Sequence, residues 1–288
     1  MKNYVVTNAY LNTNAFIELK TALKNAFEEL GEKVEFLTNA QAYSLCDKDG
    51  NGQPILFFDK DLILCRLLEK RGYRSVNGSK VIENCDDKAK TYAELFGLVS
   101  MPKTIIAPFT YENIGYTDFD FVRQAEKNLR YPIIIKDGKG SFGRQVYKAE
   151  NRAELIEKLK FLPGRSIVMQ EFIAESSGRD YRVYVVGGKA VAGGERVNEN
   201  DFRSNVQSGG TMHPIDVNGS AKYKEITLLA EKTAKIMGAD FAGVDILLSK
   251  KGALVCEVNS NAHFSALSKA TGVDVAKKIV EHYLSLKK

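Results

Sequence analysis

Residues 242–259 read AGVDILLSKKGALVCEVN, which is two apolar runs separated by the polar, turn-like segment SKKG. This pattern predicts a β-hairpin. Glu257 and Asn259 are two positions apart and therefore share a face of the second strand, and Asp245 is a cross-strand neighbour on the first. Three hard oxygen donors on one face suit Mg²⁺ that bridges substrate phosphates. The alternative is an exposed polar face, but such a face more often carries Lys, Thr or Arg, so we favour the metal.

A second chemical motif lies upstream, at residues 132–146, which read PIIIKDGKGSFGRQV. Lys136 ends an apolar strand, and a buried ammonium needs an anionic partner. The loop after it holds residues that allow a phosphate to approach the backbone: Gly138, Gly140, Ser141 and Gly143. An ordinary glycine-rich hairpin explains the loop equally well when it is taken alone. The loop does not have the Walker pattern.

A third group of residues is charged and lies between these two motifs. Asp180 and Arg182 alternate with apolar residues and therefore share a strand face. Arg196 and the segment DFRSN at 201–205, which includes Arg203, follow them. Arginines near an acidic metal cluster suit carboxylate and phosphoryl oxygens. From this segment alone, surface salt bridges are the favoured explanation.

The N-terminal residues alternate strand and helix signals, which predicts a small parallel α/β module that ends near residue 85. Predicted strands cover 3–7, 33–37 and 55–58, and predicted helices cover 14–30 and the residues from Leu62 to Gly72. After residue 86 the pattern changes to a mixture of helices and antiparallel hairpins. A second hairpin is predicted at RVYVVGGKAVAGG, with Gly187 and Gly188 in its turn.

The composition of the 288 residues excludes several classes of protein. Hydrophobic residues make up 44% and charged residues 27%, as in ordinary globular proteins, and the net charge is 41 − 36 = +5. The positive charge is scattered and forms no basic aromatic face, so nucleic-acid binding is not expected. The four cysteines form no CxxC pair and there are only three histidines, so a zinc site has little to build on. No apolar run approaches 18 residues, and we expect a soluble, cytoplasmic protein without a membrane partner.

Two further features are weak signals. Residues 47–52 (DKDGNG) begin like a calcium-binding loop, but Phe58 stands where a bidentate Glu is needed, so we interpret the segment as a turn. His263 follows the candidate metal strand and could act as a base, but a lone histidine has many structural explanations.

Taken together, the motifs resemble the ATP-grasp superfamily, and specifically its RimK-type branch of glutamate and other α-amino-acid ligases. The resemblance spans residues 75–286, through VN at 76–77, DDK at 86–88, PKT at 102–104, the loop at 132–146, MQEFI at 169–173, GRDYRVYVVGGKAVAGGER, DFRSN and the hairpin at 242–259. It implies an α/β (α+β) protein in which a small Rossmann-like pre-ATP-grasp domain precedes the ATP-grasp fold. The implied parts are 1–85, a central subdomain with the glycine-rich lid at 86–165, and a C-terminal subdomain with the metal site at 166–288.

The resemblance also implies roles for individual residues. The ATP-binding positions that it implies are Lys88, Lys136, Gly140, Ser141, Gly143, Glu171, Phe172, Asp180, Arg203, Ser204 and Asn205. The implied ligands of Mg²⁺ or Mn²⁺ are Asp245, Glu257 and Asn259. The implied stabilisers of the transferred phosphoryl group or the tetrahedral oxyanion are Arg182, Arg196 and Arg203.

The implied reaction activates a carboxylate with the γ-phosphate of ATP, and an amine then attacks the acyl phosphate to give an amide, ADP and phosphate. The partners would be a small-molecule or peptide carboxylate and an amine or amino acid such as glutamate. The alternative is an ATP-binding regulatory or scaffold protein without turnover, and a homo-oligomer is left open. One departure concerns the run SNAHFSAL at 260–267, where many RimK-type enzymes have a small residue, Pro and Gly. This departure leaves the identity of the substrates open.

Overall fold

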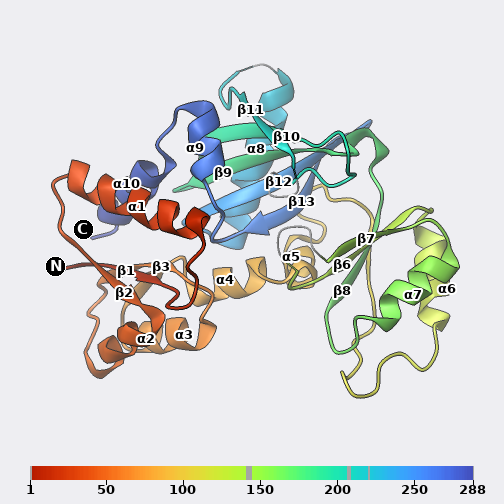
Figure 1. Cartoon of the computed structure of the whole chain (residues 1–288), viewed down its shortest axis with the longest axis horizontal. Coiled ribbons are helices and arrows are strands. Elements are labelled where there is room, and N and C mark those ends of the chain that lie inside the picture. The colour runs from red at the N-terminus through yellow and green to blue at the C-terminus, as the bar shows by residue number, and fades with distance from the viewer. Residues whose placement is uncertain (1, 141–144, 206–208, 220, 288) are drawn as a thin grey trace.

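The computed structural model describes residues 2–140, 145–205, 209–219 and 221–287. Figure 1 shows three sheets, each with helices packed against it, arranged around a central region where the three meet. The mixed α/β class and the two predicted hairpins of the C-terminal third are confirmed.

The N-terminal sheet is parallel, as its strand–helix alternation predicted. Its strands are β1 (Asn3–Thr7), β2 (Val34–Thr38), β3 (Pro54–Phe58) and β4 (Arg74–Val76), in the order β2-β1-β3-β4. The connecting elements are α1 (Asn14–Glu29), α2 (Asn39–Ala42), the 3₁₀ turn η1 (Tyr43–Asp47), α3 (Leu62–Lys70) and α4 (Ser79–Cys85). The sequence pattern missed β4 and α4, because a three-residue strand is too short to show a period. Residues 47–52 lie where η1 passes into a turn, with Asn51 at φ 48° and Gly52 at φ 76°.

The central sheet is antiparallel and holds Lys136. Its strands are β5 (Thr104–Ile106), β6 (Ile133–Asp137), β7 (Val146–Ala149) and β8 (Ile167–Glu171), in the order β5-β8-β6-β7. Apolar side chains on one face pack against α6 (Asp120–Asn128) and α7 (Arg152–Lys160). The central sheet therefore includes residues beyond 165, because β8 is the last of its four strands along the chain.

The C-terminal sheet carries the predicted metal ligands. Its strands are β9 (Arg179–Val186), β10 (Lys189–Val197), β11 (Thr211–Ile215), β12 (Phe241–Ser249) and β13 (Gly252–Asn259), in the order β11-β10-β9-β12-β13. The turn η2 (Ala174–Ser176) precedes it. The helices around it are α5 (Lys88–Leu95), α8 (Ala221–Met237), α9 (Ser265–Thr271) and α10 (Val275–Ser285). Gly187 and Gly188 turn between β9 and β10 with φ of 56° and 78°, a backbone region that strongly favours glycine.

One hydrophobic core joins the N-terminal and C-terminal sheets. It includes Phe58 of β3, Tyr184 of β9 and Phe241 of β12, and the rings of Phe58 and Phe241 stack with centroids 5.1 Å apart. Each such ring removed from water stabilises the fold by roughly 1.5–3 kcal/mol. Polar contacts add to this joint. The fully buried Asn77 donates to the carbonyls of Phe241 (2.7 Å) and Ser260 (2.9 Å) and accepts from the main-chain N–H of Asp240 (2.8 Å).

These contacts fix the loop after β13 against the end of the N-terminal sheet.

Within the described residues, no helix is both long and apolar enough to cross a membrane.

Candidate active site

A cavity of about 1070 Å³ lies where the three sheets meet. The N-terminal sheet contributes the residues that follow β1 and β3, the central sheet contributes Lys136 and Gln170, and the C-terminal sheet contributes Asp245, Glu257 and Asn259. Among the described residues, every site residue predicted from the sequence lines this cavity except Gly138 and Gly140 of the glycine-rich loop. The nucleotide and metal motifs, far apart in the chain, therefore face one space.

Lys136 lies on β6 and is 7% exposed. Its Nζ donates to Gln170 Oε1 at 2.7 Å and lies 3.4 Å from Cys256 Sγ. Gln170 is fixed in turn, because its Nε2 donates to Thr104 Oγ1 at 2.9 Å. No ion pair between Lys136 and a carboxylate occurs among the described residues. A buried ammonium with neutral partners is prepared to bind an anion.

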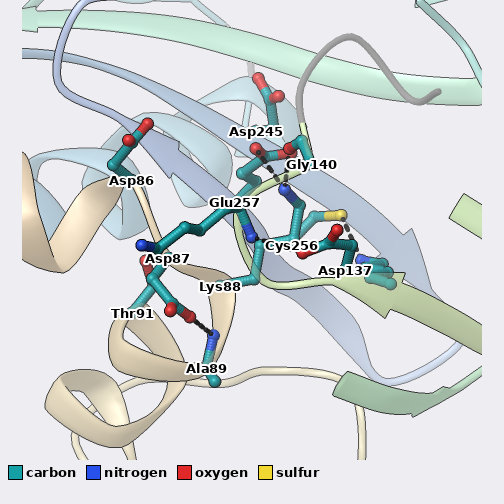
Figure 2. Close-up of polar contacts among 12 residues, drawn as sticks. Asp86, Asp87, Lys88, Ala89, Thr91, Asp137, Gly140, Asp245, Cys256 and Glu257 are labelled. Carbon is teal, nitrogen blue, oxygen red and sulfur yellow. Dashed lines mark hydrogen bonds and ion pairs between the residues drawn. The ribbon is translucent and has the colours of Figure 1, made fainter. Parts of the chain in front are cut away.

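Lys88 is the first residue of α5, whose N-cap Asp87 accepts from the main-chain N–H groups of Ala89 and Lys90. Its side chain is 10% exposed. Figure 2 shows its ammonium between the carbonyl oxygen of Gly140, to which it donates, and Glu257 Oε1, which lies 3.3 Å away. Lys88 thus connects the start of the glycine-rich loop to the candidate metal strand.

The glycine-rich loop is described only in part, and Ser141 and Gly143 lie outside the described residues. A Cβ atom on Gly138 would lie 2.6 Å from Asp87 Oδ1, and one on Gly140 would lie 2.8 Å from Gln145 Oε1. Gly138 therefore has no room for a side chain unless Asp87 and Ser166 shift, whereas the close contact at Gly140 is with the end of the flexible Gln145 side chain.

Asp245, Glu257 and Asn259 lie on neighbouring strands in the expected register. Asp245 pairs with Glu257 across β12 and β13, and Asn259 pairs with Gly243. Glu257 and Asn259 are half-buried, and Asp245 is 4% exposed. No group of three or more His, Cys, Asp or Glu side chains that could hold a metal occurs in the part of the chain that the structure describes. The set is instead two carboxylates and one amide, which are all oxygen donors.

A buried ionic network surrounds Asp245. Arg182 donates to both carboxylate oxygens through Nε and Nη2, the latter at 2.8 Å, and Arg196 Nη2 lies 2.9 Å from Oδ2. Arg196 also donates through Nε to Asp180 Oδ1 at 2.6 Å. Burial raises the pKa of Asp245, but the two guanidinium groups oppose this and leave that pKa below its ordinary value. Burial likewise opposes the charge of Arg196, yet the two aspartates raise its pKa well above the usual range.

The expectation of surface salt bridges is wrong for these two arginines, because the side chain of Arg182 is 12% exposed and that of Arg196 is 7% exposed. Arg203 is not part of this network. Its guanidinium binds Asp201, with Nη2 2.6 Å from Oδ2, and lies over the ring of Phe202 with its Cζ 5.4 Å from the ring centroid.

The remaining predicted nucleotide residues that the structure describes also line the cavity. Glu171 is held by Lys103, whose main-chain N–H donates to Glu171 Oε1 at 2.7 Å. The rings of Phe172 and Phe202 meet edge to face with centroids 6.5 Å apart, and Lys148 Nζ lies 5.4 Å from the Phe172 centroid. Ser204 is buried and Asn205 is half-buried. These two rings supply apolar surface to the wall of the cavity.

Sequence reasoning missed several cavity residues: Asn8, Asp59, Gln170, Cys256 and Asn261. Asn8 and Asp59 directly follow strands of the parallel sheet, and this position was a usable signal because ligands bind at the carboxyl ends of such strands. Gln170 and Cys256 carried no signal of their own. His263 lines the cavity, and burial together with the nearby Arg182 lowers its pKa.

Comparison with known proteins agrees with this geometry. The model of the RimK-like ATP-grasp domain matches residues 86–283. A protein of Maridesulfovibrio salexigens named "Probable alpha-L-glutamate ligase" is 36% identical over 238 residues, which cover 80% of this chain and 73% of that protein.

Two solved structures share the fold at low sequence identity. The D-alanine–D-alanine ligase of Bacillus anthracis, complexed with ATP, has a TM-score of 0.75 at 15% identity and covers 99% of this chain and 97% of its own. The ATP-grasp ligase PsnB, complexed with a minimal precursor, Mg and ADP, has a TM-score of 0.71 at 15% identity and covers 99% of this chain and 98% of its own. The family match, the relative and the shared fold agree: the chain belongs to the RimK-like ATP-grasp family of ATP-dependent carboxylate–amine ligases.

Proposed function

We propose that this protein joins an amino acid, with glutamate as the first candidate, to a small-molecule or peptide carboxylate in a reaction that requires ATP and Mg²⁺ or Mn²⁺. The observation that carries the proposal is the meeting of Lys136, the Lys88–Glu257 pair and the Asp245–Glu257–Asn259 set in one cavity. Glutamate is the first candidate because the similar protein of Maridesulfovibrio salexigens is named "Probable alpha-L-glutamate ligase".

ATP would bind with its adenine at the hinge formed by Glu171 and Phe172 and its phosphates toward the two lysines. The ring pair Phe172–Phe202 offers the apolar faces that adenine stacks on. Lys136 would bind phosphate oxygens with an ammonium whose present partners, Gln170 and Cys256, are neutral. The glycine loop, of which Gly138 and Gly140 are described, would cover the phosphates and exclude water from the acyl phosphate.

The donors on β12 and β13 fit a hard divalent cation. The contacts of Asp245 with Arg182 and Arg196 use three of the roughly four acceptor sites of a carboxylate, so one site on Oδ1 is left for a metal. Two carboxylates and an amide leave room for phosphate oxygens and water, which is the coordination that Mg²⁺ prefers. When bound, the ion would neutralise charge on the transferring phosphoryl oxygens.

Arg182 and Arg196 would stabilise the negative charge that develops during phosphoryl transfer and on the tetrahedral oxyanion. Their own partners, Asp180 and Asp245, hold the guanidinium groups rigidly, so little reorganisation is needed when the charge appears. Arg203 would contribute from the nucleotide side, since its contacts are with Asp201 and Phe202.

We also propose the division into an N-terminal domain at 1–85, a central subdomain and a C-terminal subdomain, with the central sheet continuing through β8 to Glu171. A cytoplasmic location is part of the proposal, and it is consistent with four free cysteines.

The substitution Glu257→Ala tests the proposed function. It removes a metal ligand and the partner of Lys88, and we expect substrate-dependent ADP release to fall at least 100-fold, as when a group that stabilises transition-state charge is lost. The matched control is Glu175→Ala, which removes an exposed glutamate outside the cavity and should keep full activity.

ADP release would be measured for pairs of substrates, in which each amino acid is combined with each member of a series of carboxylates. Full activity of Glu257→Ala would contradict the metal assignment. Absence of stimulation of the wild-type protein by any pair would favour the regulatory alternative.

A further inference from the structure

The carboxyl end of the N-terminal sheet meets the cavity at the point where the strand order reverses. The order β2-β1-β3-β4 places this switch point between β1 and β3. Asn8 follows β1, Asp59 follows β3, and Asn8 Nδ2 donates to Asp59 Oδ1 across the gap at 3.2 Å. Crevices at such switch points are where open α/β sheets bind ligands.

Only one of the two carboxylate oxygens of Asp59 accepts hydrogen bonds from described residues. Its Oδ1 accepts from Asn8 and from the main-chain N–H groups of Lys60 (2.6 Å) and Asp61 (3.1 Å), and all three donors are neutral. Its Oδ2 is buried and has no hydrogen-bond partner among the described residues, and the residue is 6% exposed. Burial raises the pKa of Asp59 in spite of these bonds, so its charged form would gain from a cation.

A second unpartnered oxygen comes from the loop that departs from the family pattern. Asn261 donates through Nδ2 to the main-chain oxygen of Asp59 at 2.9 Å, and its own Oδ1 is buried without a partner in the described part of the chain. Asn261 is two residues beyond Asn259, which limits the separation of their Cα atoms to about 7 Å. Both Asp59 and Asn261 line the cavity.

Two acceptor oxygens, one of them on a carboxylate, match a ligand that carries several donors and a positive charge. The cationic side chains near this end of the cavity are already paired, since Lys60 binds Asp86 and Lys269 binds Glu18. A primary ammonium group is the ligand chemistry that satisfies both oxygens.

We propose that Asp59 and Asn261 form a subsite for the ammonium group of the carboxylate substrate, which is therefore an amino acid or a short peptide with a free amino group. This inference rests on the proposed ligase function. A carboxylate that binds an ammonium stabilises its protonated form, and a protonated amine cannot attack an acyl phosphate. The ammonium at Asp59 thus belongs to the molecule that is activated and not to the attacking amine.

Direct binding tests the subsite without requiring turnover. Calorimetry in the presence of MgADP would compare alanine with propionate, 4-aminobutyrate with butyrate, glutamate with glutarate, and alanylalanine with propionylalanine. We expect the wild-type protein to bind at least one amino compound about 10- to 100-fold more tightly than its desamino partner, the range for a charge-assisted hydrogen bond. Asp59→Asn keeps an oxygen for the turn at Lys60 and Asp61 and should abolish the preference, with MgADP affinity unchanged.

The matched control is Asp61→Asn, which removes a charge next to the subsite from a residue that does not line the cavity. Asp61 is the N-cap of α3, and asparagine caps helices equally well. This variant should keep the preference.

The proposal is overturned if no amino compound binds more tightly than its desamino partner, or if Asp59→Asn retains the preference. A measurement of ADP release distinguishes failure of the subsite from failure of the proposed ligase function. Equal release with amino and desamino carboxylates would overturn the subsite and leave the ligase intact. A preference in binding without any ADP release would leave the subsite intact and contradict the ligase.

Discussion

Replacement of Lys136 by methionine should separate ligand binding from folding. Lys136 is 7% exposed, and its ammonium donates to Gln170 Oε1 and contacts Cys256 Sγ. Methionine has a similar length and carries no charge, so Lys136→Met removes the ammonium and largely keeps the packing.

Two effects of opposite sign act on the ligand-free protein. Removing a buried charge that lacks an ionic partner relieves a desolvation penalty of several kcal/mol. Leaving Gln170 Oε1 without this donor costs about 1–3 kcal/mol. We therefore expect the free energy of unfolding to stay within about 1 kcal/mol of the wild-type value or to rise.

ATP binding should respond in the opposite direction. A charge-assisted bond between the ammonium and a phosphate in this partly buried site contributes about 2–4 kcal/mol, so its loss weakens binding about 30- to 1000-fold. Calorimetry measures the affinity for ATP, and urea denaturation measures the free energy of unfolding. Lys158→Met, on the surface of α7, is the control for loss of one positive charge.

Unchanged ATP affinity in Lys136→Met would refute the phosphate role. A loss of more than about 3 kcal/mol of stability would refute the reasoning about the buried charge, because it would mean that Lys136 is mainly a structural residue.

Two further predictions concern the ionic network around Asp245. Arg196→Met leaves the buried carboxylates of Asp180 and Asp245 with one cationic partner fewer, and it should lower the free energy of unfolding by about 3–5 kcal/mol in urea denaturation. The control is Arg179→Met at an exposed arginine, which should change the free energy of unfolding by less than about 1 kcal/mol. Equally small effects of both substitutions would contradict a buried network. The pKa of Asp245 is lower in the folded protein than in the unfolded chain, because Arg182 and Arg196 outweigh the effect of burial. The ionised carboxylate therefore stabilises the fold at any pH above the unfolded pKa of about 3.9. This stability is lost as the pH falls from about 3.9 toward the pKa in the folded protein. Asp245→Asn should therefore flatten the fall in the free energy of unfolding between about pH 5 and pH 2, and an unchanged slope would contradict this assignment.

Local pattern was enough to predict the elements that carry the chemistry. The alternation of side chains along a strand placed Glu257 and Asn259 on one face, and the turn residues between the apolar runs predicted the pairing with Asp245. The N-terminal parallel module and both C-terminal hairpins followed from the same periodicities. These features depend on the backbone period and on turn chemistry, which neighbouring residues determine by themselves.

Contacts between distant segments could not be predicted in this way. The residues around Lys88 in the sequence do not indicate that its ammonium contacts Glu257. The salt bridges of Arg182 and Arg196 were expected to lie at the surface. Nothing in the sequence places Asp59 beside Asn261, and only the docking of the N-terminal sheet against the loop after β13 brings them together.

The sequence by itself therefore determined the longer strands, the hairpin turns and the donor groups that they carry, because those properties arise within a few residues of chain. Tertiary structure alone decided which charges are buried, which partners neutralise them and which oxygens remain without a partner. Burial and pairing depend on how three sheets pack around one cavity, and that packing sums many weak contacts between residues far apart in the chain.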